Sequence, residues 1–165
     1  MMYEFRDVNE NLTQEYIPAE ALQINGELIE TQIEGYHTMY VQGREALSPE
    51  ISTYEIGTKN GEIRKNKRYP ARTITVGYQL IAESAEAFRE AYNKLGRILN
   101  VDDAEIIFND EPDKFFIGTP SEVSEIDPGL NSVKGEFKIL CLDPLKYSVA
   151  EYEAEPLDDD KGTIL

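Results

Sequence analysis

Alternating apolar and polar positions in the middle of the chain predict β-strands. In the range Arg72–Ala82, the side chains of Ile74, Val76, Tyr78 and Leu80 alternate with small or polar residues. Successive side chains of a strand point to opposite faces, so an apolar period of two indicates a strand with one buried face. We therefore expect this range to form a strand that lies against the core.

The range Ser132–Leu142 shows the same alternation near the end of the chain. The apolar positions on its first face are Val133, Phe137, Ile139 and Cys141. Leu140 and Leu142 add apolar side chains to the second face. Strands that are buried on both faces are apolar throughout, so we expect this strand to be central and covered on both sides.

Shorter runs of strand-forming residues surround these two ranges. They are Leu22–Ile29, Thr38–Gln42, Ile51–Ile56, Glu105–Phe108 and Lys114–Ile117. Asn25-Gly26 interrupts the first run, and this pair is typical of a tight hairpin turn. The range Asn109–Asp113 joins two apolar runs and predicts a hairpin loop.

One segment has the spacing of a helix. After Ser84, apolar side chains recur every three or four residues, at Phe88, Ala91, Tyr92, Leu95, Ile98 and Leu99. Residues at this spacing form one stripe along a helix, and serine is a residue type that caps helix N-termini. We expect an amphipathic helix that packs on the sheets, which makes the fold class mainly β (α+β).

The charge of the chain is strongly acidic but unevenly distributed. Its 165 residues include 16 basic and 32 acidic side chains, for a formal net charge of −16. Such an excess of carboxylates disfavours general nucleic-acid binding, because phosphates require a cationic surface. Residues 59–72 nevertheless carry +5, so that the remainder of the chain carries −21.

We interpret the basic stretch as an exposed hairpin or loop that projects from an acidic body. It is either an ordinary solvated loop or a surface that complements an acidic neighbour, since unlike charges favour oriented association. In the second interpretation, it forms a subunit interface. The candidate interface residues are Arg64, Lys65, Lys67, Arg68 and Tyr69.

The sequence contains little from which to build an active site. His37 is the only histidine and stands at an expected strand start, where a structural role is commoner than acid–base chemistry. Cys141, the only cysteine, falls in an apolar strand, which predicts a buried and inert thiol. Asp110, Glu111 and Asp113 cluster in a turn, and the pKa of exposed carboxylates is seldom raised. We predict a protein that is not an enzyme, with no catalytic residues, cofactor or metal.

The two ends of the chain differ from its middle. Residues 1–21 show no sustained period, and we interpret them as an N-terminal arm. Residues 149–165 are rich in Glu and Asp, and we interpret them as an acidic C-terminal tail or remnant linker. The single domain is expected at residues 22–148. No apolar run reaches the ~18 residues that a membrane-spanning helix needs.

Three local motifs, in this order, resemble a known family. They are Pro-Ala-Arg-Thr-Ile-Thr-Val at residues 70–76, Asp-Glu-Pro-Asp followed by aromatic residues at 110–116, and Asp-Pro-Leu-Lys-Tyr at 143–147. Together with the order of strands and helix over Leu22–Ser148, they resemble the N-terminal domain of the distal tail protein family. That family belongs to long-tailed phages and prophages of Gram-positive bacteria.

The resemblance implies a fold and a structural function. Family members form an antiparallel β-sandwich with one flanking amphipathic α-helix, and six copies close into a ring. The ring joins the distal end of the tail tube to the tail tip or baseplate, and DNA passes through its centre without being specifically bound. The implied partners are further copies, tube proteins and tail-tip proteins, with no membrane. The implied location is the virion tail, after synthesis in the host cytoplasm.

Two alternatives to this function stay open, and one departure from the family is visible. The alternatives are a tail-tube or tube-terminator ring protein and a carbohydrate-binding β-sandwich module. Such modules usually expose Trp platforms, and this chain has no Trp. Larger family members continue into a galectin-like domain, for which the residues after Ser148 are too few. Either the protein is a minimal ring subunit or the chain has been shortened, and in both cases sugar or receptor binding is not carried over from the family.

Overall fold

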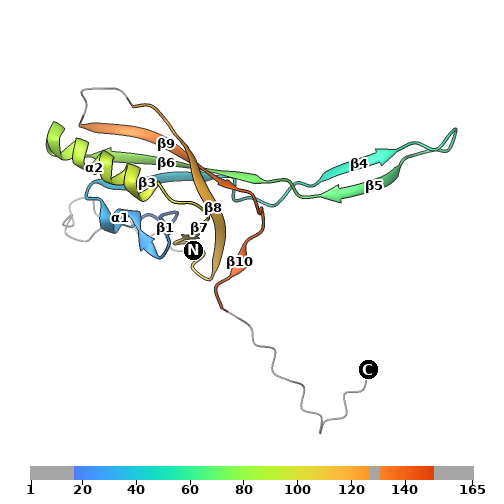
Figure 1. The fold of residues 1–165 in the computed structure, drawn as a ribbon, viewed down its shortest axis with the longest axis horizontal. Coiled ribbons are helices and arrows are strands. Elements are labelled where there is room, and N and C mark those ends of the chain that lie inside the picture. Colours follow the sequence, from blue (N-terminus) through green and yellow to red (C-terminus); the bar gives the residue numbers. More distant parts are fainter. Residues whose placement is uncertain (1–16, 127–130, 151–165) are drawn as a thin grey trace, which may run out of the picture.

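The computed structural model describes residues 17–126 and 131–150, and it shows one continuous antiparallel sheet that folds into two layers (Figure 1). The first layer contains β2 (Glu27–Leu28), β1 (Leu22–Ile24), β7 (Ala104–Phe108) and β10 (Tyr147–Ser148). The second contains β9 (Ser132–Cys141), β6 (Arg72–Ile81) and β3 (Tyr36–Gln42). The long strand β8 (Lys114–Val123) belongs to both layers.

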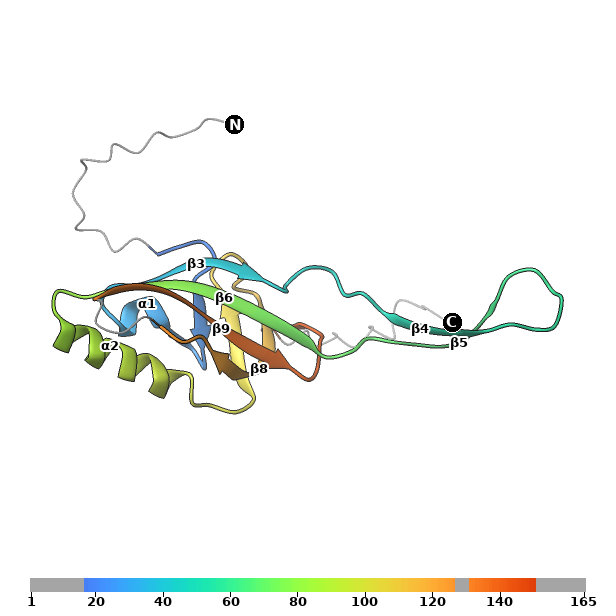
Figure 2. The same ribbon diagram turned by 90° about the horizontal axis from the view of Figure 1, so that it is seen from above.

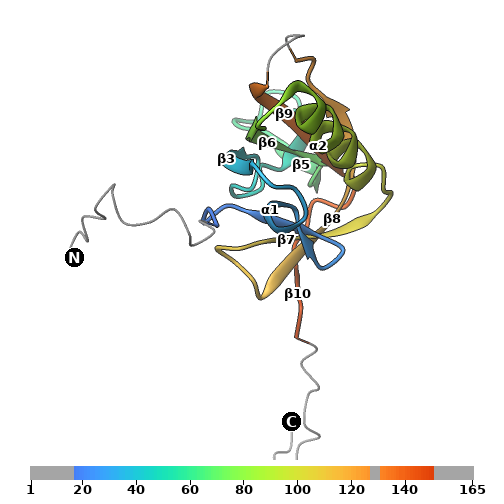
Figure 3. The same ribbon diagram turned by 90° about the vertical axis from the view of Figure 1, so that its left-hand side faces the viewer.

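Two helices and a separate hairpin complete the fold. The short α1 (Ile29–Gln32) follows β2, and α2 (Ala85–Ile98) follows β6. Viewed end-on, α2 flanks the two layers on one side (Figure 3). The strands β4 (Glu50–Tyr54) and β5 (Ile63–Arg68) pair only with each other. Neither helix in the described part of the chain is long and apolar enough to cross a membrane.

The strand β8 changes partner halfway along its length. Its first half pairs with β7, where Phe116 lies opposite Ile106, and its second half pairs with β9, where Thr119 lies opposite Leu140. Gly118 stands at the change, and a side chain there would overlap Ile139. A shift in register follows between Pro120 and Glu122. Gly118 and this irregularity let the strand cross from one layer to the other.

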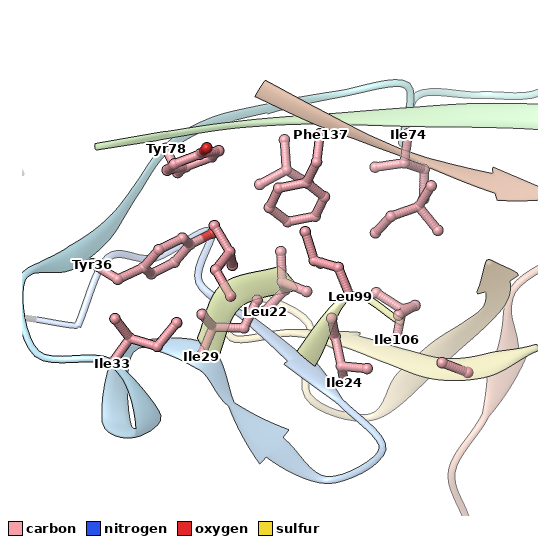
Figure 4. Packing of buried hydrophobic residues seen from close by; sticks show 14 of the residues in the cluster. Leu22, Ile24, Ile29, Ile33, Tyr36, Ile74, Tyr78, Leu99, Ile106 and Phe137 are labelled. Atoms are coloured by element: carbon pink, nitrogen blue, oxygen red, sulfur yellow. The ribbon is translucent and has the colours of Figure 1, made fainter. Parts of the chain in front are cut away.

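The hydrophobic core lies between the two layers and is closed by the helices. Leu22, Ile24 and Ile106 from the first layer face Ile74 and Phe137 from the second (Figure 4). The helix α2 adds its own buried side chains, Phe88, Leu95 and, just after the helix, Leu99. The apolar stripe expected from the sequence therefore closes the core, as helical spacing predicts.

Most of the predicted elements are confirmed. The strands expected at Arg72–Ala82 and Ser132–Leu142 are β6 and β9, which pair along their whole length. The helix begins after Ser84, whose hydroxyl oxygen accepts a hydrogen bond from the Ala87 backbone N–H at 3.1 Å. Asn25-Gly26 forms the expected tight turn, with positive φ angles of 51° and 84°. The mainly-β sandwich class is correct.

The expectation that β9 is covered on both faces is wrong. Leu140 is 36% exposed, and Leu142, just after the strand, is 71% exposed. The strand is central in hydrogen bonding, between β8 and β6, but only its inner face meets the core. Within the described residues, this chain supplies no third layer to cover the outer face.

Two aromatic rings pack over glycines on opposite faces of the second layer. The ring of Tyr40 lies over Gly77 on the outer face, and its hydroxyl group hydrogen-bonds to Glu136. The ring of Tyr78 covers Gly135 on the inner face. It lies between the Tyr36 ring, whose centre is 5.5 Å from its own, and the ring of Phe137. Burial raises the pKa of Tyr78 to about 12. The two glycines provide the space that these rings occupy.

These paired sites predict unequal costs for the same substitution. In Gly135→Ala, the new methyl group would stand 2.6 Å from the Tyr78 hydroxyl oxygen, and the buried ring has no room to move. We expect a loss of about 1–3 kcal/mol in the free energy of unfolding. In Gly77→Ala, the exposed Tyr40 ring can swing into solvent, so the loss should be smaller. Urea unfolding of both variants checks this, and equal losses would contradict it.

Candidate assembly interface

The hairpin β4–β5 forms an arm that projects from the two-layered body (Figure 2). Its strands pair from Glu50 opposite Arg68 to Tyr54 opposite Ile63. All residues of both strands are exposed. An isolated two-stranded hairpin is at best marginally stable in water, because it buries little apolar surface. Contact with another molecule would therefore stabilise the arm.

The structure places the predicted interface residues together on this arm. Arg64, Lys65, Lys67 and Arg68 lie on β5, and Tyr69 directly follows it. The Lys67 ammonium stands 5.6 Å from the centre of the Tyr69 ring. Their role as an interface stays a prediction, but four of the five side chains lie on β5 and the fifth directly follows it, all exposed.

The arm is less cationic as a whole than β5 alone. The Arg68 guanidinium forms a 2.9 Å ion pair with Glu50 of β4, and both side chains remain largely exposed, so the pair adds little stability. The other three basic residues, Arg64, Lys65 and Lys67, form no ion pair within the described ranges. These three cations are available to a partner.

Exposed apolar side chains accompany the cations, and charge-based reasoning on the sequence missed them. Ile51 is 55% exposed, and three further side chains on the arm are exposed to a similar degree: Tyr54, Ile56 and Ile63. The signal was present in the sequence, since Ile51–Ile56 has strand-like residues. The arm thus combines apolar and basic groups, a composition suited to a contact that excludes water.

Two arginines fix the root of the arm. The Arg72 guanidinium lies 5.2 Å from the centre of the Phe116 ring and donates hydrogen bonds to the carbonyl oxygens of Gly43 and Glu45. These carbonyl groups belong to the segment that leads from β3 into the arm. Since Phe116 belongs to β8, Arg72 ties the outgoing chain to the body.

The second arginine, Arg44, makes the stronger contact. Its two terminal nitrogens donate to the two carboxylate oxygens of Asp110, both at 2.9 Å. Its guanidinium carbon lies 4.3 Å from the centre of the Phe108 ring. Paired charge-assisted hydrogen bonds and stacking on an aromatic face both restrict the orientation of the guanidinium. The root of the arm is therefore held in a defined direction.

The acidic turn at residues 109–113 has a structural role at the root of the arm. Asp110 holds Arg44, Glu111 pairs with Lys146 at 2.8 Å, and the carbonyl oxygen of Asp113 accepts a hydrogen bond from Val149. The turn anchors both the arm root and the chain after β10. Of the three carboxylates named in the sequence analysis, those of Asp110 and Glu111 form ion pairs, and Asp113 contributes its backbone carbonyl.

The remaining candidate chemical groups lie apart from the arm. His37 is half-buried within β3. Cys141 is fully buried at the end of β9, and burial raises the pKa of its thiol to about 11, which keeps it protonated and unreactive. Among the described residues, no three His, Cys, Asp or Glu side chains cluster as metal ligands would.

Comparison with known families and structures connects this geometry to phage tails. The model of the phage tail protein RIFT-related domain family matches residues 25–141, which is most of the described chain. A search of curated proteins finds no match. The family match confirms the resemblance to phage tail proteins that the sequence motifs indicated.

Two solved structures are similar to this chain. The crystal structure of the Dit protein of phage SPP1 aligns with a TM-score of 0.66 and 24% identity, over 78% of this chain and 51% of that one. This chain therefore spans about half the length of that protein, and the likeness confirms the fold. The anti-feeding prophage cap, a tube-terminating cap, aligns with a TM-score of 0.44 and 14% identity, over 81% of this chain and 91% of that one.

The clamp at the arm root predicts a measurable coupling between Arg44 and Asp110. In a double-mutant cycle of Arg44→Ala and Asp110→Ala, we expect about 1–2 kcal/mol of coupling in the free energy of unfolding, because the pair is bidentate and partly buried. The exposed pair Arg68–Glu50 is a matched control, with an expected coupling below ~0.5 kcal/mol. Similar coupling in the two cycles would contradict the clamp.

Proposed function

Since the chain belongs to the phage tail protein RIFT-related domain family, and is therefore a component of a phage tail, we propose that it is a non-enzymatic structural subunit that assembles into a ring. The ring connects the distal end of the tail tube to the tail tip or baseplate. Six copies are the number implied by the resemblance to distal tail proteins. The likeness to the Dit protein of phage SPP1, whose structure is described as that of a hub adsorption apparatus, supports the distal position.

The observation that carries the proposal is the contrast between the arm and the body. A closed ring requires a heterologous contact, in which one surface of each copy meets a different surface of the next. The arm offers exposed apolar side chains and the unpaired cations Arg64, Lys65 and Lys67. The arm, residues 50–68, holds 5 basic and 3 acidic side chains, for a net charge of +2, whereas the rest of the described chain holds 9 basic and 18 acidic side chains, for −9. The two surfaces attract each other, whereas two arms repel.

The acidic character of the chain also suits a passage for DNA. Phosphates bind to proteins largely by releasing counterions as Lys and Arg replace them. A channel lined mainly by carboxylates lacks this driving force, so DNA moves through it without being held. In this proposal, the DNA is cargo of the assembled tail and is not specifically bound.

The proposal predicts that charge reversal on the arm breaks the ring. We expect the triple variant Arg64→Glu, Lys65→Glu and Lys67→Glu to remain folded and monomeric, because these side chains are exposed and make no ion pair within the described chain. The matched control reverses three exposed basic residues of the body, Arg89, Lys114 and Lys134, with the same change in net charge.

Native mass spectrometry and size-exclusion chromatography with light scattering measure the outcome, at several protein concentrations and with tail-tube protein added as a template. A ring in the native protein and in the body control, lost in the arm variant, supports the proposal. Equal loss in both variants would show an effect of total charge alone. A native protein that forms a two-fold dimer, or no ring with the template, would refute the proposed function.

A further inference from the structure

We propose that the arm of one copy docks into a groove at the opposite end of the next copy, between α2 and the start of β3. This inference rests on the proposed ring and names the surface that receives the arm. The groove has a volume of about 1080 Å³ and is lined by residues of α1, β3, β6 and α2. Its apolar side chains include Ile81, which is 46% exposed, together with Ala87 and Ala91 of α2.

The arm and the groove lie at opposite ends of the same strand. Arg72, at the root of the arm, is the first residue of β6, and Ile81, in the groove, is the last. Ten strand residues separate these ends by ~30 Å, and Figure 1 shows the arm and the start of α2 on opposite sides of the body. A contact between opposite ends joins copies head to tail, a heterologous arrangement that closes into a ring when the rotation from one copy to the next is a fraction of a full turn.

The groove has an ordered distribution of charge. Glu34 and Glu83 lie at the end of the groove where β6 leads into α2. Glu90 lies about two helical turns further along α2. Lys94 and Arg97 line the groove further along α2. Because a helix rises ~1.5 Å per residue, Glu83 and Arg97 are separated by ~20 Å along the groove, and the acidic part meets the basic part between Glu90 and Lys94. An arm that enters the groove from the end where β6 leads into α2 passes the carboxylates first and reaches Lys94 and Arg97 afterwards.

The arm carries the complementary order. Its tip, residues 55–62, has a net charge of −1 because Glu55 and Glu62 outweigh Lys59, whereas β5 behind it carries +4. Glu62 and Lys67 are separated by ~17 Å along the strand, close to the length of the groove's charge pattern. A docked arm therefore places its cations against the acidic entrance and its acidic tip near Lys94 and Arg97. Ile56 and Ile63 then lie over the apolar side chains of the groove.

A second exposed apolar area fits the arm less well. Leu142 and Leu145 are exposed beyond the end of β9, which pairs with the start of β6 at Arg72. This area lies at the same end of the body as the arm root. An arm docked there would bring the arm-bearing ends of two copies together, where each arm could reach the other copy and close a two-fold pair. An acceptor at the far end keeps the two contact surfaces of each copy apart, which favours a head-to-tail contact.

A charge swap tests the inference. The groove variant Glu83→Lys with Glu90→Lys should weaken ring formation at least tenfold in dissociation constant, and so should the arm variant Lys65→Glu with Lys67→Glu. The four substitutions combined should restore the ring, because the attraction is re-established with reversed signs. The control variant Glu105→Lys with Glu125→Lys changes exposed carboxylates outside the groove and should leave the ring intact.

The results separate this inference from the proposed function. Rings that survive the groove variant but not the arm variant would overturn the groove as acceptor while the ring function stands. Absence of rings in the native protein, with and without tail-tube protein, would refute the proposed function itself. Circular dichroism of each variant verifies folding. As a second measurement, Lys65→Cys with Glu90→Cys should form disulfides between copies under oxidising conditions, and a failure to crosslink within intact rings would also overturn the groove.

Discussion

The structure depends on one strand that hydrogen-bonds to both layers. If β8 paired only with β7, the two layers would be joined by side-chain packing alone, and their relative orientation would follow the core. Because β8 continues from β7 to β9, backbone hydrogen bonds set that orientation. The arm leaves from the second layer, but its root is clamped to Asp110 and Phe116 beside the first. The direction of the arm is thus determined by how β8 joins the layers.

The open edge of the second layer shows how the body avoids unspecific pairing. An edge strand exposes backbone N–H and C=O groups that invite a further strand. On β3, the backbone N–H of Thr38 donates to the Glu30 carboxylate and that of Val41 donates to the Glu20 carboxylate, both at 3.1 Å. These carboxylates occupy donors that another strand would need and add negative charge along the edge. Association is thereby directed away from this edge and toward side-chain surfaces.

The sequence was sufficient to predict the elements that pack one face against the core, because such packing requires a regular apolar period. The strand β6 and the helix α2 face the core with regular periods, and their patterns were sufficient. The strand β5 has the sequence Ile-Arg-Lys-Asn-Lys-Arg, which carries no alternation, and it becomes a strand only through pairing with β4. The prediction that β9 is covered on both faces rested partly on Leu142 and was wrong, because an apolar side chain in the sequence does not show whether the same chain or another molecule buries it. The clamp of Arg44 on Asp110 joins residues 66 positions apart, a proximity that no local pattern encodes.

The arm contributes little to the stability of its own chain, and this has a consequence for how assembly is encoded. Exposed strand residues bury almost no surface on folding, so substitutions on β5 should change the free energy of unfolding by small amounts. When a partner covers these side chains, they lose their water, and their apolar area and charge then contribute to the free energy of association. In the proposed ring, folding and association therefore use separate sets of residues: the core and the clamp position the arm, and the arm makes the contact between copies. A chain built in this way can fold as a monomer, remain soluble through its negative charge, and associate only where a complementary surface is presented.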